Sequence, residues 1–316
     1  MASALDSKLL VVMGKGGVGK STIAAALALA AAGRGLRTLV VELGDQCRLA
    51  GLMAGNDTDE PADTAREREL APHLWSLTID PERATLEWLQ KLGGRVPGRM
   101  LAGSGTFQYF AAAAPGAKEL VTMVKIWELT ESARWRRRSR SYDLVVLDAP
   151  ATGHALGLLH APYTFGAIAR VGPIFSQAQH IRELLEDPLR TSYLTVTHPT
   201  EMAIGETLEL HADLHERVSR EPLATIVNAT LPRRFDAGEL ARIAALAHLE
   251  REPRRSAALA ARTVHHRAAA QQRHLARLRR AGARVLTVPF VFAPQLDSHA
   301  VRHIGDALAH KLQARG

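Results

Sequence analysis

The sequence predicts an α/β protein with a doubly wound, mostly parallel β-sheet and a helical subdomain inserted at one edge. Short apolar and β-branched runs alternate with longer stretches of helical periodicity, and this alternation is typical of βαβ units. The run 143–147 ends in four consecutive apolar residues, as expected of a central parallel strand that is buried on both faces. We expect the 316 residues to form a single domain, 1–316.

The strands are expected in the following order along the chain. Leu9–Val12 is the first, and a helix from Ser21 to Gly33 follows it and ends at glycine. The remaining strands are expected at the other β-branched runs, which are 37–41, 74–79, 143–147, 193–197, 223–227 and 284–288. Because helical segments separate them, the strands can be joined by crossover connections into a parallel sheet.

The helical subdomain is expected at 82–141 together with 160–190, where helical periodicity dominates. Two segments, the polar 55–69 and the glycine-rich 93–105, are expected to be loops. The apolar positions of the subdomain either line a groove or form its core, and their spacing favours the core.

Composition restricts the classes of site. The single cysteine, Cys47, excludes an intrachain disulfide and any C-x-x-C metal site, and it indicates a cytoplasmic protein. No apolar run reaches the roughly 18 residues of a membrane-spanning helix. The net charge of +8 favours acidic partners such as nucleotides, nucleic acid or anionic lipid. The alternative is a solvated, arginine-rich surface.

A phosphate-binding loop follows the first strand. Residues 14–21 read GKGGVGKS and match the pattern G-x-x-x-x-G-K-S/T between a strand and a helix. We expect Lys20 to reach the β- and γ-phosphates of ATP and the Ser21 hydroxyl to ligate Mg²⁺. Glycines let backbone N–H groups converge on phosphate oxygens. The expected nucleotide-binding residues here are Gly14, Gly16, Gly17, Val18, Gly19, Lys20, Ser21 and Thr22.

The loop carries a second lysine, Lys15, directly after its first glycine. The sequence KGGVGKS resembles the deviant phosphate loops of the superfamily that contains ArsA/Get3, MinD/ParA and the nitrogenase iron protein. This resemblance implies that Lys15 crosses a dimer interface and neutralises charge on the partner's nucleotide, as an arginine finger does. The alternative is an exposed lysine beside the loop.

A second motif narrows the resemblance. Residues 148–154 read DAPATGH and closely resemble switch II of the ArsA/Get3 ATPases. The resemblance implies that Asp148 holds the Mg²⁺ shell and that the Gly153 backbone senses the γ-phosphate. It also implies that His154 links the nucleotide state to helix position.

Other segments agree with the same resemblance. Asn228 ends an expected strand at the place where the family uses an asparagine to read adenine, and Pro289 lies in the segment that packs on the base. No N-K-x-D pattern accompanies Asn228, so guanine specificity has no visible basis. Further similar segments are IDP at 79–81, APGAKE at 114–119 and EMAIGET at 201–207.

The segment after the second expected strand, which corresponds to the first switch of the family, departs from the family pattern. An ungapped match places Gly44 where the family has the aspartate that positions the attacking water, and Asp45 follows one residue later. We favour Asp45 as the catalytic substitute, assisted by Glu42, and the alternative is that both acids are structural. A displaced water-positioning group predicts slow hydrolysis with intact ATP binding.

The resemblance implies an ATP-hydrolysing switch protein, acting as a homodimer or as a heterodimer with a related ATPase. ATP state would control binding of a hydrophobic client, such as a tail-anchored membrane protein, or of a partner protein. Two alternatives stay open: a ParA/MinD-like positioning ATPase on DNA or membrane, and a weakly active regulatory subunit. The basic run Arg134–Arg140 fits a helix end as well as a polyanion. We do not expect nucleic acid as a partner, and we expect membrane contact only through a transient partner.

Overall fold

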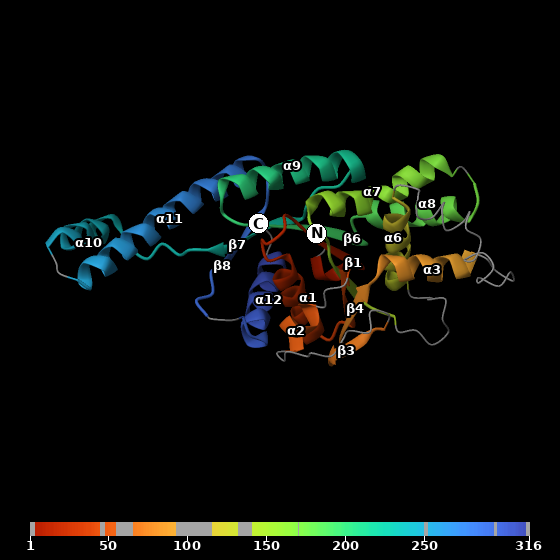
Figure 1. Ribbon diagram of the computed structural model, residues 1–316, viewed down its shortest axis with the longest axis horizontal. Helices are drawn as coiled ribbons and strands as arrows, with labels where there is room; N and C mark the ends of the chain where they lie inside the picture. The colour runs from red at the N-terminus through yellow and green to blue at the C-terminus, as the bar shows by residue number, and fades with distance from the viewer. Residues whose placement is uncertain are drawn as a thin grey trace.

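The computed structural model describes residues 4–44, 48–54, 66–92, 116–131, 141–169, 171–249, 252–293 and 296–313. Within these ranges the chain forms an eight-stranded sheet in the order β3-β4-β2-β5-β1-β6-β7-β8, with helices on both faces (Figure 1). The strands are β1 (Leu9–Met13), β2 (Thr38–Leu43), β3 (Arg68–Ala71), β4 (Leu74–Ile79), β5 (Leu144–Asp148), β6 (Thr191–Thr197), β7 (Ala224–Thr230) and β8 (Val285–Pro289).

All strand pairs except one are parallel, which confirms the predicted sheet. Strand β1 lies in the middle and pairs with β5 on one side and β6 on the other. The exception is β3, which pairs antiparallel with β4 at the edge of the sheet. The predicted loop at 55–69 was therefore wrong at its last two residues, which belong to β3. Residues 68–71 contain no β-branched side chain, and pairing with β4, where Trp75 Nε1 donates to Glu69 Oε2 at 3.2 Å, determines their conformation.

Two apolar cores cover the two faces of the sheet. Alternate residues of β1 contribute to different cores, with Val12 in one and Val11 in the other. Helices α1 (Lys20–Gly33), α2 (Arg48–Ala54) and α12 (Ser298–Gln313) lie on the first face (Figure 1). Gly305 lets α12 approach α1 closely, because a Cβ at that position would lie 2.0 Å from the Ala26 carbonyl oxygen.

Helices α7 (Thr152–Ile168) and α9 (Glu201–Val218) lie on the second face. Helices α3 (Pro81–Leu92), α6 (Ala117–Thr130) and α8 (Pro173–Glu186) gather with α7 at one end of the molecule (Figure 1). Most of the apolar residues of α6 and α8 that the sequence assigns to a core are buried, and Met123 and Leu184 are fully buried. That these helices form a separate subdomain stays a prediction. The segment 93–105 and the basic run Arg134–Arg140 lie outside the described residues.

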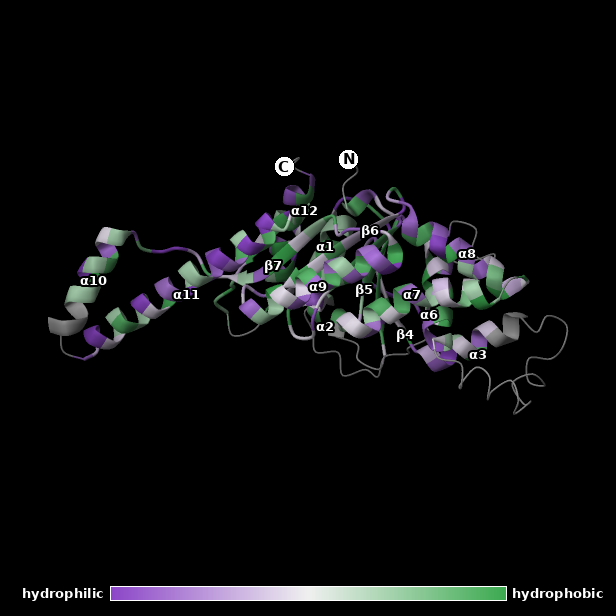
Figure 2. Ribbon diagram, turned by 90° about the horizontal axis from the view of Figure 1, so that it is seen from above, coloured by the Kyte–Doolittle hydropathy of each residue, from purple (hydrophilic) through white to green (hydrophobic). Residues whose placement is uncertain are grey.

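At the opposite end, α10 (Ala237–Leu249) and α11 (Arg254–Arg280) pack on each other and project away from the sheet (Figures 1 and 2). We call this pair of helices the arm. Only the second half of α11 reaches the body, where Leu275 and Leu278 pack with Ile204 and Val227. None of the helices in the described ranges combines the length and apolar composition needed to cross a membrane.

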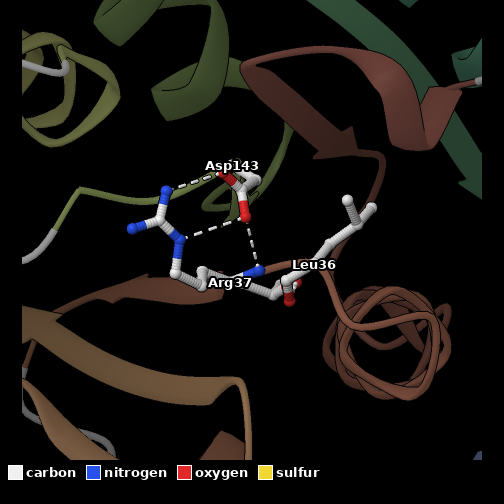
Figure 3. Close-up of polar contacts among 4 residues, drawn as sticks. Leu36, Arg37 and Asp143 are labelled. Carbon is white, nitrogen blue, oxygen red and sulfur yellow. Dashed lines mark hydrogen bonds and ion pairs between the residues drawn. The ribbon is translucent and has the colours of Figure 1, made fainter.

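An ion pair connects the starts of two central strands. The backbone N–H of Arg37 donates to Asp143 Oδ2 at 2.8 Å, and its guanidinium donates to both carboxylate oxygens at 3.2 and 2.9 Å (Figure 3). The hydrogen bonds from Arg37 lower the pKa of Asp143. The next residues, Thr38 and Leu144, are register partners in β2 and β5. The pair therefore fixes the register at the end of the sheet opposite the phosphate loop.

Candidate functional site

The predicted phosphate loop connects β1 to α1 at the carboxyl ends of the parallel strands, where ligands of open α/β sheets bind. Two of its glycines are required by their surroundings. Gly14 has φ +146°, and a Cβ there would lie 2.2 Å from the Val196 carbonyl oxygen. Gly19 has φ +91°, and a Cβ there would lie 2.3 Å from Asn228 Nδ2. The loop therefore lies directly against β6 and β7.

Asn228 anchors the loop. Its side-chain amide donates to the Val18 carbonyl oxygen at 3.0 Å, and its Oδ1 accepts from the Ala229 backbone N–H at 2.9 Å. The predicted reading of adenine by Asn228 stays a prediction. The sequence did not predict the contact between Asn228 and Val18, because 210 positions separate these residues and no local pattern connects them.

The Lys20 ammonium group points back into the loop. Its Nζ donates to the Lys15 carbonyl oxygen at 3.0 Å. Burial lowers the pKa of Lys20, and the nearby Asp148 carboxylate opposes this shift. A partly desolvated ammonium beside converging backbone N–H groups is suited to binding phosphate oxygens.

Ser21 and Asp148 are in contact, and their roles toward Mg²⁺ stay predictions. The Ser21 hydroxyl at the start of α1 donates to Asp148 Oδ2 at the end of β5, at 2.6 Å. A hydroxyl and a carboxylate next to a phosphate-binding loop fit Mg²⁺, which takes few protein ligands and completes its shell with phosphate oxygens and water. The described residues contain no group of three or more His, Cys, Asp or Glu side chains that would hold a metal alone. The Ser21 hydroxyl and the Asp148 carboxylate fit Mg²⁺ that enters with a nucleotide.

Lys15 is paired within its own chain. Its Nζ lies 2.6 Å from Glu206 Oε1 on α9, and the two side chains are 41% and 35% exposed. Sequence reasoning placed Glu206 only in a segment of family resemblance and did not predict this contact. The other oxygen, Glu206 Oε2, is buried and makes no hydrogen bond within the described residues.

The second-switch residues after Asp148 lie at the start of α7. Gly153 and His154 fall in the first turn of this helix, and both are exposed. The structure places them at the same edge of the sheet as Asp148. Their roles toward the γ-phosphate stay predictions.

At the first switch, Glu42 is held by the fold. Its carboxylate is buried and accepts from Thr78 Oγ1 at 3.2 Å and from the Leu49 backbone N–H of α2 at 3.4 Å. These contacts support the structural interpretation of Glu42. Gly44 has φ +96°, a conformation that an aspartate adopts only with strain. Asp45 lies outside the described residues.

The expected base-binding segment is at the end of β8. Pro289 is exposed, and the next residue, Phe290, donates its backbone N–H to Thr230 of β7 at 2.9 Å. Phe290 and Phe292 form a T-shaped pair with ring centroids 4.8 Å apart. The Arg234 guanidinium lies 5.2 Å from the Phe292 ring centroid. Sequence reasoning missed Phe292 and Arg234, since neither lies in a recognised motif.

Comparison with known proteins agrees with this geometry. Residues 7–176 match the family of anion-transporting ATPases named after ArsA. The chain is 32% identical over 246 residues to the ATPase BagA of Mycobacterium tuberculosis, covering 75% of this chain and 69% of that protein. It is 28% identical over 279 residues to the ATPase GET3B of Arabidopsis thaliana, covering 73% of this chain and 66% of that protein.

The family match spans the phosphate loop, Ser21 and Asp148, and it includes the second-switch residues at the start of α7. The similarity to BagA extends over three quarters of the chain. Both results agree with the parallel sheet and with the loop at its carboxyl edge. On this combined evidence, the chain belongs to the ArsA/Get3 family of ATPases.

Proposed function

We propose that this protein is a Mg²⁺-dependent ATPase whose active unit is a dimer and whose ATP state controls binding of a hydrophobic client or a partner protein. The observation that carries the proposal is the convergence of Lys20, Ser21 and Asp148 at one edge of the sheet. Ser21 and Asp148 are in contact at 2.6 Å, and the partly buried Lys20 is electrostatically coupled to the same aspartate.

The residues of the loop divide the work of binding ATP. Backbone N–H groups of the loop and the N-terminus of α1 bind phosphate oxygens. Lys20 exchanges the Lys15 carbonyl oxygen for the β- and γ-phosphates, and its partial burial strengthens that charge interaction. Ser21 and Asp148 would hold Mg²⁺. When bound, this ion neutralises charge on the transferred phosphoryl group.

Two residues complete the proposed hydrolysis step. Asp45 positions the attacking water in place of the family aspartate. Lys15 leaves Glu206 and binds the nucleotide of a partner subunit. A half-exposed ion pair contributes only about 0.2–1 kcal/mol, so binding of phosphate readily replaces it.

The client is proposed to be hydrophobic because large apolar side chains are exposed near the ends of α7 and α8. Ile168 ends α7 and is 72% exposed, and Val171, just before α8, is 84% exposed. Exposed apolar patches on proteins mark interaction sites. The buried apolar residues of α6 and α8, such as Met123 and Leu184, are not available for this role.

Single-turnover hydrolysis of radiolabelled ATP tests the proposal. Wild type should release phosphate at a rate that Lys20→Ala reduces by at least about 100-fold, since one charge-stabilising group is removed. Asp45→Asn should bind ATP normally and hydrolyse it more slowly. If wild type is no faster than Lys20→Ala, the ATPase proposal fails.

A weakly active regulatory subunit is the second candidate. It is favoured by Gly44, a glycine with positive φ at the position of the family aspartate, and by the structural contacts that hold Glu42. Neither residue then positions the attacking water. The same experiment separates the two functions. The regulatory function would be supported if the protein binds ATP tightly without hydrolysing it and if hydrolysis appears when a related subunit is added.

A further inference from the structure

Helix α11 is unusually basic for its length. It contains eight arginines and no aspartate or glutamate over Arg254–Arg280. Figure 2 shows hydrophilic residues recurring along this helix as it leaves the body of the protein. Because α11 belongs to the projecting arm, most of its surface is available to another molecule.

Most of these arginines form one row. At 3.6 residues per turn, six basic side chains lie within about 60° of each other around the helix axis. They are Arg255, Arg262, His266, Arg273, Arg277 and Arg280, and we call them the arginine row. All except the half-buried Arg262 are exposed. Of the four buried residues of α11, Ala268, Leu275 and Leu278 lie on roughly the opposite side, and Ala258 lies about 60° from the row. The exposure of five of its six members shows that the row faces solvent.

The charges of the row are not neutralised within the described part of the chain. None of its five arginines forms an ion pair with a described carboxylate, and Arg280 Nε donates only within its own helix, to the Ala276 carbonyl oxygen. Three described acids at or just before the starts of the arm's helices have other partners. Glu239 and Asp236 exchange hydrogen bonds at the start of α10, and Glu252 accepts from the Ser256 hydroxyl.

We propose that the arginine row binds the phosphate backbone of a nucleic-acid duplex without reading its sequence. The row extends over 25 residue steps, or about 38 Å of helix, which is close to the roughly 34–36 Å turn of a DNA duplex. Arginine presents a planar fork of N–H donors that matches phosphate oxygens. This inference reverses the expectation from the sequence that nucleic acid is not a partner.

The composition of α11 favours a duplex over a lipid surface. A helix that lies in a membrane interface inserts large apolar side chains. The exposed side of α11 offers one, Leu259 at 46% exposure, and is otherwise alanine, serine, threonine and basic residues. The larger apolar residues Leu275 and Leu278 pack against the body. The row therefore has the charge for a polyanion and lacks the apolar side chains for insertion.

Fluorescence anisotropy with a labelled 30-base-pair duplex of random sequence tests the proposal. The test variant is Arg273→Ala/Arg277→Ala. The matched control, Arg267→Ala/Arg279→Ala, removes the same charge from the same helix at positions about 120° away from the row. Alanine preserves helix propensity in both variants, and thermal unfolding checks that both are folded.

Wild type should bind in the micromolar range or tighter at 50 mM KCl, with a log–log salt slope of about −4.5 for five phosphate contacts. The row variant should bind about tenfold more weakly, with a slope less steep by about 2. The control should bind within about twofold of wild type. Equal losses in the two variants, or no binding by wild type, would overturn the proposal.

Two further measurements distinguish the duplex from an anionic membrane as the ligand, and the arginine row from the ATP site as the binding surface. Vesicles containing phosphatidylserine should bind more weakly than the duplex, and stronger binding to vesicles that needs the row would refute the duplex. Lys20→Ala should bind the duplex like wild type, because the arm does not contribute to the ATP site. Failure of the arginine row is thereby distinguishable from failure of the proposed ATPase.

Discussion

Lys15 of the phosphate loop and Glu206 of α9 form an ion pair with 2.6 Å between Nζ and Oε1. The pair holds the lysine over its own subunit, whereas the family resemblance assigns it to the nucleotide of a partner. Both side chains are partly exposed, so the pair is weak enough to exchange. It therefore opposes the proposed dimer, and its removal should be measurable.

Glu206→Gln should promote ATP-dependent dimerisation. Losing a partly exposed pair worth about 0.2–1 kcal/mol should lower the dimer dissociation constant by about 1.5- to 5-fold. Sedimentation velocity with a non-hydrolysable ATP analogue measures this constant. Glu209→Gln, an exposed acid one turn away on α9, serves as the control and should leave it unchanged. A weaker dimer in Glu206→Gln would show that Glu206 supports the interface.

Gly14→Ala should destabilise the protein even without nucleotide. A Cβ at Gly14 would lie 2.2 Å from the Val196 carbonyl oxygen, so strand β6 or the loop must move. We expect a loss of about 1–3 kcal/mol in the free energy of unfolding, measured by urea denaturation. Gly16→Ala is the matched control, because a Cβ there has no neighbour within 4 Å. Equal losses at both positions would contradict the close approach to β6.

Asp148→Asn should raise the Mg²⁺ concentration needed for hydrolysis. Asp148 contacts Ser21, and substitution removes the only carboxylate shown to contact Ser21 within the described residues. Changes in groups that hold or orient metal ligands cost about 10- to 100-fold in metal affinity or activity. Mg²⁺ titration of ATP hydrolysis gives the half-saturating concentration. Asp143→Asn, at the opposite end of the same strand, should leave this concentration unchanged, and a similar increase there would indicate a general loss of structure.

Stability should fall below about pH 6.5 because of His211. Its Nε2 lies 3.0 Å from Thr195 Oγ1 and 3.3 Å from Thr225 Oγ1. Burial lowers the pKa of His211, and the Glu221 charge opposes this shift. As pH falls, His211 is therefore protonated at a higher pH in the unfolded chain than in the folded protein. The stabilisation from neutral His211 is complete above the ordinary pKa of 6.5 and is lost as pH falls below it.

Urea denaturation at pH 7.5 and 5.5 measures this effect. Between pH 7.5 and 5.5, the free energy of unfolding of wild type should fall by up to about 1 kcal/mol more than that of His211→Gln, because glutamine does not titrate. His215→Gln, an exposed histidine on the same helix, should behave like wild type. Parallel losses in all three proteins would assign the acid sensitivity to other groups.

The alternation of strands and helices was predictable because it depends on local periodicity. Parallel strands such as 143–147 are apolar at successive positions, and this pattern survives in any context. Ser21 and Asp148 were predictable for a related reason, since each lies in a continuous motif and parallel strands bring their carboxyl ends to one edge. Strand β3 was not predictable, because its pairing with β4 overrides a weak local preference.

The sequence by itself determined the phosphate loop, the second switch and the family resemblance, since each is a run of neighbouring residues. Only the tertiary structure decided that Asn228 anchors Val18 across 210 positions and that Glu206 pairs with Lys15 across 191. It also decided that α11 projects from the body and that five of the six members of its arginine row are exposed. The reason is physical, because a side chain's partner depends on how the helices and strands pack, and no short segment of the chain contains that information.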